Sequence, residues 1–477
     1  MNTVEKLVVN FVLFSVLLSV VVVGGIKVSQ TPFLGNGFLA VLKILPPATV
    51  SVAATTGEPE PAVEPAIEEV VIEPETLLPE GNFIRPLVEA KNKLLVSGLP
   101  FAEINFPEMA IGYYEGNELV STTSVKTAGD PQGWGGTPAG LYSVLSKNER
   151  AFSASAEAYM PQALHFYGKY FIHGEPYYAS GKKINSPVSG GCVQVADEYA
   201  PRLFETLSPN LPVLVVDKNY DDFIYPVARS SAAPKVTAEG ILVADLNSGE
   251  VVFEKNSTEK FSIASVTKLM TAVVVAENVD LRRNITVNDE MIELGFGTTG
   301  NLLVDASFRV VELFYPLLIE SSNDAAEAVS GFLGRERTIT LMNEKTKNLF
   351  MEDTSFEDPS GIGTKNISTA RDLYLLGRYI KNNRRPILDI TKGKAVTSFG
   401  PVRFKVSAME NKNEFAKDGN FIGGKSGYLD EAKNTGLFLF KIKVAGTERE
   451  VAIVVLKSEH LKRDVEALRS WLDEAYR

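Results

Sequence analysis

Three short elements in the C-terminal half of the chain contain residue types that can carry out serine acyl transfer. Ser265 and Lys268 are three positions apart in a stretch that runs into a helical pattern, so a helix places both on one face. A lysine kept neutral beside a serine can accept the hydroxyl proton. Two further matches to this spacing are interpreted as chance: Ser180/Lys183 and Ser257/Lys260.

Two later elements distinguish the Ser265/Lys268 pair from the chance matches. Ser321 and Asn323 form a Ser-x-Asn element at the start of a helical stretch. Lys425-Ser426-Gly427 precedes the strand-like residues 436–443 and offers a cation and a hydroxyl, which suit an anionic carboxylate. Three such elements in this order together indicate a serine acyl-transfer site.

A second candidate site surrounds Cys192, the only cysteine of the chain. A lone cysteine is usually a small buried hydrophobe. Gly190 and Gly191 precede it, however, and glycines let backbone amides approach a substrate oxygen as an oxyanion hole. His173 lies nineteen residues upstream and could accept the thiol proton, since the thiolate is the nucleophile.

Residues 234–477 resemble the serine D-Ala-D-Ala carboxypeptidases, the small penicillin-binding proteins. The phrases at 264–268, 323–326, 356–361 and 368–372 carry the resemblance beyond the three elements. It implies that the serine attacks the carbonyl of the penultimate D-Ala. The resemblance implies that Ser265 is the nucleophile, that Lys268 is the base, and that Ser321 relays the proton to the leaving amine. Asn323 would bind the peptide amide, and Lys425, Ser426 and Gly427 would bind the terminal carboxylate. The backbone amides of Ser265 and Tyr428 would form the oxyanion hole.

Residues 95–217 resemble an L,D-transpeptidase catalytic domain, whose fold is a mainly β sandwich. The family motif is a histidine, about fifteen residues, then Ser/Thr-His-Gly-Cys; here His173 is followed by residues 174–188 and Ser189-Gly190-Gly191-Cys192. Residues 136–140 match the family's Thr-Pro-x-Gly turn. The resemblance implies that Cys192 is the nucleophile that becomes acylated and that His173 is the base, oriented by the Gly174 carbonyl. Ser189 would contact the substrate, and the backbone amides of Gly190, Gly191 and Cys192 would form the oxyanion hole.

Two positions depart from the transpeptidase pattern. Gly190 stands where the family has its second histidine, and Gln194 stands where arginine or asparagine is usual. The backbone amide survives the first change, whereas the side-chain contacts to substrate do not. An inactive, peptidoglycan-binding version of this domain is therefore the alternative to a live enzyme.

The elements that must position these residues predict a multidomain chain. Short β-like runs with Gly and Pro punctuation fill residues 89–228, with no long helical period before about 196–207, which predicts a mainly β domain. Residues 229–477 are expected to form an α/β domain with an antiparallel sheet and helices. Its last helix has an apolar stripe that would cover the sheet: Leu461, Val465, Leu468 and Leu472. We call residues 89–228 the first domain and 229–477 the second domain.

The N-terminal region predicts a membrane end and a tether. Residues 7–26 contain no charge and are long enough to cross a bilayer, so residues 1–28 are expected to be an uncleaved anchor, with a signal peptide as the alternative. Residues 29–88 read as a linker rich in Pro and Glu, with eight glutamates and no Lys or Arg between 44 and 84. Anchor and linker leave two folded domains of the roughly three that 477 residues suggest.

Composition excludes several classes of function. The net charge of −11 argues against a general nucleic-acid binder, and eight of these charges belong to the linker. A single cysteine excludes intramolecular disulfides, zinc fingers and iron–sulfur clusters, and three histidines leave little room for a histidine metal site, so neither a metal nor a cofactor is expected.

The sequence thus predicts a bifunctional peptidoglycan-modifying enzyme. A serine D,D-carboxypeptidase would remove terminal D-Ala from stem peptides, and a cysteine L,D-transpeptidase would crosslink them. β-Lactams would inhibit both covalently, and the catalytic domains would lie outside the cytoplasm on a single-pass membrane anchor. The alternatives are a single active D,D-carboxypeptidase or endopeptidase with a binding module, or a β-lactamase.

Overall fold

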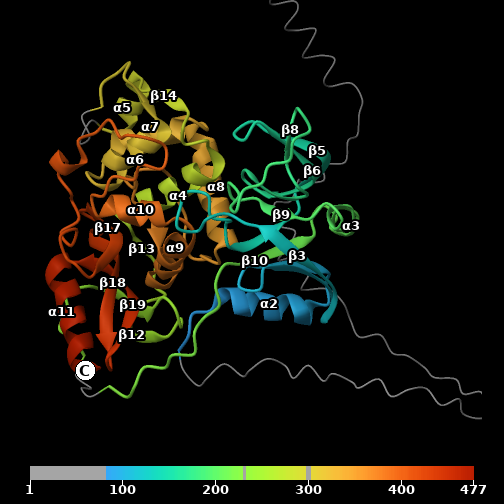
Figure 1. Cartoon of the computed structure of the whole chain (residues 1–477). Coiled ribbons are helices and arrows are strands. Elements are labelled where there is room, and N and C mark those ends of the chain that lie inside the picture. The colour runs from blue at the N-terminus through green and yellow to red at the C-terminus, as the bar shows by residue number, and fades with distance from the viewer. Residues whose placement is uncertain (1–81, 229–232, 297–301, 477) are drawn as a thin grey trace, which may run out of the picture. The chain divides into compact units, whose positions relative to one another are not determined.

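The computed structural model describes residues 82–228, 233–296 and 302–476, all within one compact unit that spans Thr76–Arg477 (Figure 1). In this part of the chain no helix is long and apolar enough to cross a membrane. The predicted anchor at 1–28 and nearly all of the predicted linker lie outside the described residues.

The first domain is built on a ten-stranded mixed sheet. The strands follow the order β4-β10-β1-β2-β3-β9-β7-β6-β5, with β8 beside β6. Pairing is antiparallel except for the parallel pairs β1/β10 and β7/β9. The bounds are β1 Phe101–Asn105, β2 Ala110–Glu115, β3 Glu118–Thr127, β4 Gly140–Ser143, β5 Ser146–Ser153, β6 Ala158–Tyr167, β7 Tyr170–His173, β8 Tyr177–Tyr178, β9 Val193–Val195 and β10 Pro212–Val216.

Two helices accompany this sheet, and the sequence analysis missed one of them. Helix α3 (Ala200–Thr206) lies where a helical period was expected, but α2 (Pro86–Ser97) precedes it and begins inside the predicted linker. A proline at its start and Gly98 with φ 70° after its end delimit α2. Its buried positions are Leu87, Ala90 and Leu94, and the helix packs on β10 and β4.

The second domain contains an antiparallel sheet and helices, as predicted; the sheet has five strands and helices on both faces. The strand order is β12-β11-β19-β18-β17, and Figure 1 shows α9 and α11 on opposite sides of it. The predicted apolar stripe of α11 is confirmed, since Val465, Leu468 and Leu472 are buried against the sheet. The sheet strands are β11 Gly240–Asp245, β12 Val251–Lys255, β17 Phe421–Leu429, β18 Lys433–Val444 and β19 Thr447–Ser458.

The remaining elements of the second domain surround that sheet. Two short pairs are formed by β13 (Phe261–Ser262) with β16 (Ile367–Ser368) and by β14 (Asn284–Thr286) with β15 (Ser307–Arg309). The helices are η2 Ala264–Thr267, α4 Lys268–Asn278, α5 Asp289–Leu294, α6 Val310–Leu318, α7 Asn323–Gly331, α8 Arg335–Asn348, α9 Ala370–Asn383, α10 Arg385–Thr391, η3 Val406–Ala408 and α11 Leu461–Ala475.

The two domains share a buried ionic cluster centred on Glu277, near the end of α4. Arg384 Nη2 lies 2.9 Å from Glu277 Oε1, and Lys345 Nζ lies 2.9 Å from Glu277 Oε2. Lys345 also donates to the hydroxyl of Tyr142, which belongs to the first domain. Every charge in this cluster has an opposite charge beside it, which a buried ion requires.

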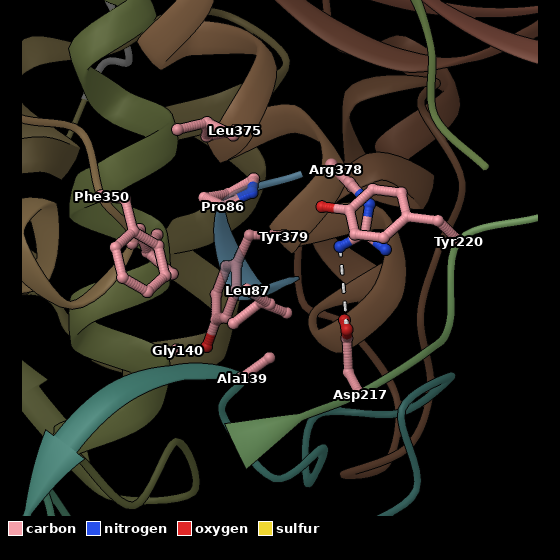
Figure 2. A pocket seen from close by; sticks show the side chains of 11 residues that line it. Pro86, Leu87, Ala139, Gly140, Asp217, Tyr220, Phe350, Leu375, Arg378 and Tyr379 are labelled. Atoms are coloured by element: carbon pink, nitrogen blue, oxygen red, sulfur yellow. Dashed lines mark ion pairs between the residues drawn. The ribbon is translucent and has the colours of Figure 1, made fainter. Parts of the chain in front are cut away.

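A small cavity of about 30 Å³ also lies between the domains (Figure 2). Its walls include Ala139 and Asp217 of the first domain and Leu375 and Arg378 of the second. Arg378 Nη1 lies 3.7 Å from Asp217 Oδ1, the ion pair drawn in Figure 2. The space is enough for about one or two water molecules and is too small for a substrate.

Candidate active sites

The serine site lies where η2 meets α4 and strand β17 passes beside them. Ser265 belongs to η2, and Lys268 is the first residue of α4. A Cβ at Gly427 would lie 2.6 Å from the backbone nitrogen of Ser265, so glycine is needed for the strand to pass this closely. Tyr428 follows Gly427 on β17. The two predicted oxyanion donors, the backbone amides of Ser265 and Tyr428, therefore belong to η2 and β17, which pass close to each other.

Lys268 is fully buried, and its side-chain nitrogen has three close oxygen neighbours. Nζ lies 2.9 Å from Ser265 Oγ, 2.7 Å from Asn323 Oδ1 and 2.5 Å from the Ser360 carbonyl oxygen. A neutral amine has two N–H groups and one lone pair. When Lys268 is neutral, the Asn323 amide oxygen and the Ser360 carbonyl oxygen can accept its two N–H groups, and its lone pair can then accept from the Ser265 hydroxyl.

The electrostatics of the site favour a neutral Lys268. Burial lowers the pKa of Lys268 well below its ordinary value, and the positive charge of Lys425 acts in the same direction. Burial also lowers the pKa of Lys425, to about 7. A neutral lysine beside a serine is the arrangement that general-base activation requires.

A cleft of about 360 Å³ opens beside Ser265. It brings together residues from all three predicted elements and from Tyr428, because Ser265, Ser321, Asn323, Lys425, Ser426, Gly427 and Tyr428 all line it. Asn323 begins α7, and the preceding Ser322 caps that helix by accepting from the Ala325 amide. Ser321 has φ 62°, a conformation that is uncommon for a residue other than glycine.

The sequence analysis assigned no role to Asp358, which organises the loop that contacts Lys268. Its carboxylate accepts from the amides of Ser360 (2.8 Å), Gly361 (2.6 Å) and Gly363 (2.7 Å). These bonds hold the Ser360 carbonyl at Lys268. Residues 356–361 carry part of the resemblance, so the sequence contains this signal. The contact between the Ser360 carbonyl and Lys268, however, depends on the fold.

The cysteine site lies on the parallel strands β7 and β9. The register pairs Ile172 with Val193 and His173 with Gln194. Cys192 is therefore offset from His173 by two positions, and alternate residues of a strand share a face. His173 is buried, and its Nδ1 lies 2.6 Å from the Gly174 carbonyl oxygen, the contact that the resemblance implied.

The thiol of Cys192 has no hydrogen bond with His173 among those of the described residues. Its Sγ instead lies 3.8 Å from the Lys169 carbonyl oxygen, and it packs beside an apolar cluster that includes Met160 and Phe171. Burial raises the pKa of Cys192 to about 11, and burial lowers the pKa of His173. In this arrangement both groups are neutral.

The glycines before Cys192 differ in their surroundings. Gly191 has φ 118°, and a Cβ there would lie 2.3 Å from Tyr170 Cε1, whereas a Cβ at Gly190 would meet nothing within 4 Å. The Gly191 amide, a predicted oxyanion donor, donates to Ser189 Oγ at 3.0 Å. The Ser189 hydroxyl in turn donates to the Cys192 carbonyl at 2.5 Å, so Ser189 stabilises the loop that contains the cysteine.

Gln194, the second departure from the transpeptidase pattern, is buried between strands. Its Oε1 accepts from Thr127 Oγ1 at 2.7 Å, in register across the β3/β9 pair. This contact gives Gln194 a structural partner that could not be read from its own neighbourhood in the sequence. No group of three or more metal-binding side chains occurs among the described residues.

Comparison with known proteins supports both resemblances. The family model of D-alanyl-D-alanine carboxypeptidase matches residues 227–459, and that of the L,D-transpeptidase catalytic domain matches residues 100–215. The D-alanyl-D-alanine endopeptidase of Haemophilus influenzae is 32% identical over 211 residues, covering 43% of this chain and 70% of that protein.

Two proteins of Escherichia coli (strain K12) are also similar. The D-alanyl-D-alanine endopeptidase is 25% identical over 256 residues, which cover 52% of this chain and 80% of that protein. The D-alanyl-D-alanine carboxypeptidase DacC is 28% identical over 269 residues, which cover 52% of this chain and 64% of that protein. The chain thus belongs to the D-alanyl-D-alanine carboxypeptidase family, with a domain that matches the L,D-transpeptidase catalytic domain preceding the family region.

Proposed function

We propose that the second domain is a serine D,D-carboxypeptidase acting on peptidoglycan stem peptides. The observation that carries this proposal is the 2.9 Å contact between Lys268 Nζ and Ser265 Oγ, beside a cleft that Ser321, Asn323 and Lys425 also line. The family relatives supply the substrate class, a peptide that ends in D-Ala-D-Ala.

In the proposed reaction, Ser265 Oγ attacks the carbonyl carbon of the penultimate D-Ala while its proton passes to Lys268 Nζ. The tetrahedral oxyanion accepts hydrogen bonds from the amides of Ser265 and Tyr428. Collapse breaks the peptide C–N bond, and a proton relayed through Ser321 goes to the departing D-Ala amine. Water then cleaves the acyl ester, which releases the shortened peptide and restores the serine hydroxyl.

Substrate binding in this proposal uses the remaining residues of the cleft. Protonated Lys425 and the Ser426 hydroxyl bind the terminal carboxylate beside Gly427, and Asn323 binds the peptide amide. The same groups would bind the carboxylate and amide of a β-lactam, so Ser265 is the expected site of penicillin acylation.

We propose further that the first domain is an L,D-transpeptidase. The Cys192 thiolate would attack the carbonyl that precedes D-Ala at stem position four, with His173 as base. D-Ala leaves with a proton, a thioester remains on Cys192, and the amine of a second stem peptide then attacks it and frees the thiol. The product of the second domain, a tetrapeptide, is the donor for this reaction, which makes the two domains a relay.

A binding module without catalysis is the second candidate for the first domain. The contact of Cys192 Sγ with the Lys169 carbonyl, rather than with His173, favours it. Mass spectrometry of the chain after carbapenem treatment distinguishes the two. An adduct on Cys192 supports the transpeptidase, whereas an adduct on Ser265 alone supports the module.

The relay is tested with the purified chain and a pentapeptide stem substrate. D-Ala release and L,D-crosslinks are expected from the wild type, and Ser265→Ala should lose both. Supplying tetrapeptide should restore crosslinking to Ser265→Ala but not to Cys192→Ala. Unchanged crosslinking of pentapeptide by Ser265→Ala would contradict the relay.

Two alternatives for the second domain have their own measurements. The endopeptidase relatives motivate incubation with a D,D-crosslinked dimer, where cleavage would assign endopeptidase activity. The decay of a penicillin adduct on Ser265 tests for a β-lactamase, which turns the adduct over quickly. We also propose that both domains lie outside the cytoplasm, where peptidoglycan is found, on the anchor expected at 1–28.

A further inference from the structure

Residues 128–139, the loop between β3 and β4, touch both domains. Trp134, in the middle of the loop, is 5% exposed and lies in the apolar core of the second domain. Its ring centroid is 5.4 Å from that of Phe314 in α6. One side of this loop is thus anchored in the domain that contains Ser265.

The other side of the same loop holds the backbone that leads to Cys192. The Ala128 carbonyl accepts from the Ser189 amide at 2.9 Å, and Thr137 Oγ1 donates to the Gly191 carbonyl at 2.8 Å. A Cβ at Gly135 would lie 3.3 Å from the carbonyl carbon of Gly190. The position of the glycines before the cysteine therefore depends on where this loop is held.

Arg384 of the second domain reaches this arrangement by two routes. Its Nη1 donates to the Gly136 carbonyl at 2.5 Å, within the loop itself. Its Nη2 donates to the Tyr170 hydroxyl at 2.8 Å, and the Tyr170 ring is the group that a Cβ at Gly191 would strike. Arg384 is fully buried, and Glu277 of the second domain pairs with it, so its position is set from that side.

We propose that Arg384, a residue of the carboxypeptidase domain, is a positioning residue for the Cys192 site. The inference rests on the L,D-transpeptidase activity proposed above. Backbone amides stabilise an oxyanion only when they are already aimed at it, and glycines are free to turn away. Arg384 fixes both the loop and the tyrosine against which Gly191 packs, so the first domain alone lacks part of what aims its amides.

The test compares two reactions of one thiol in the full chain. Carbapenem acylation of Cys192 needs the oxyanion amides, whereas iodoacetamide alkylation needs only an accessible thiolate. Arg384→Gln and Tyr170→Phe are expected to lower the acylation rate by about 10–100-fold, as for a misplaced reacting group. Alkylation of Cys192 and penicillin acylation of Ser265 should stay within about twofold of wild type.

The matched control is Tyr199→Phe, which removes a hydroxyl from an exposed tyrosine of the first domain. It should leave all three rates unchanged. Arg384→Lys keeps the charge and one donor, and it is expected to recover part of the carbapenem reaction. Tyr170→Phe keeps both the ring and the Arg384–Glu277 pair, so it tests the route through Tyr170 even if Arg384→Gln unfolds the protein, and Arg384→Lys then tests the route through Gly136.

Two outcomes separate this inference from the function on which it rests. If the wild type forms no carbapenem adduct on Cys192, the transpeptidase proposal fails, and this inference fails with it. If the wild type reacts and both Arg384→Gln and Tyr170→Phe react with carbapenem at the wild-type rate, the transpeptidase proposal stands and the role of Arg384 is overturned.

Discussion

Lys268 and Lys425 are both buried at the serine site, and the charge of Lys425 adds to burial in lowering the pKa of Lys268. Two buried ammonium groups at close range repel each other, so one of them is favoured in its neutral form. The two lysines can therefore have different roles. Neutral Lys268 acts as the base beside Ser265, and charged Lys425 binds the substrate carboxylate.

The pKa of about 7 for Lys425 predicts an alkaline decline in carboxypeptidase activity. A lysine is charged below its pKa, so carboxylate binding should weaken as the pH rises through about 7, and kcat/KM of the free enzyme should fall. Lys425→Arg, which stays charged, should extend activity to higher pH. The pH profile of D-Ala release measures this, and identical alkaline limbs in both proteins would contradict it.

The raised pKa of Cys192, about 11 through burial, predicts slow and strongly pH-dependent alkylation. Below its pKa the thiol is neutral, so the rate with iodoacetamide should rise about tenfold per pH unit between about pH 7 and 10. The chain has one cysteine, so the label is specific, and Cys192→Ser serves as the blank. A plateau near the ordinary thiol pKa of ~8.5 would show that the thiol is not desolvated.

The two glycines before Cys192 should respond differently to the same added methyl group. Gly191→Ala forces an L residue to φ 118° and against the Tyr170 ring, so we expect a loss of at least about 1–3 kcal/mol in the free energy of unfolding. Gly190→Ala enters open space and should change stability by less than about 0.5 kcal/mol. Urea unfolding of the two variants measures the difference, and equal losses would contradict the surroundings described here.

Glu277 should stabilise both domains together, because its partners join them. Glu277→Gln leaves Arg384 and Lys345 buried without their counter-charge, so we expect a loss of about 3–5 kcal/mol in the free energy of unfolding. Burial raises the pKa of Glu277, but Lys345 and Arg384 together lower it by more than burial raises it. The resulting pKa of Glu277 therefore lies below the ordinary value for glutamate.

The depressed pKa of Glu277 sets the pH window of its contribution. The stabilisation is present above the ordinary pKa of glutamate and is lost as the pH falls through the lower folded value. Wild type and Glu277→Gln should therefore differ at neutral pH and converge in acid. A matched control is Glu357→Gln, at an acid that accepts from the Lys365 amide near the surface. A loss as large in the control would contradict the special role of Glu277.

Much of the serine site and its surroundings could be predicted because the signals are local. Ser265 and Lys268 are three positions apart at the start of a helix, and that spacing within one helical turn lets Nζ lie 2.9 Å from Oγ. The stripe of α11 is confirmed for the same reason, since a period of 3.6 residues places Val465, Leu468 and Leu472 on one face.

Other local signals were too weak to be recognised. Helix α2 has buried residues at 87, 90 and 94, a helical spacing, but its apolar pattern is short, and it straddles the predicted boundary between the linker at 29–88 and the mainly β domain at 89–228. Likewise Glu277 is a single acid directly after the largely apolar residues 269–276, which could have marked it as a buried charge with a distant partner.

The sequence by itself determined which residues could carry the chemistry and in which order they occur. Only the tertiary structure decided what each of them touches: the Ser360 carbonyl meets Lys268 across 92 positions, and Arg384 meets the Gly136 carbonyl across 248. Local periodicity specifies a helix or a strand, but a contact over such a separation exists only once whole elements have packed. The same reason explains why the Cys192 loop depends on a side chain from the other domain.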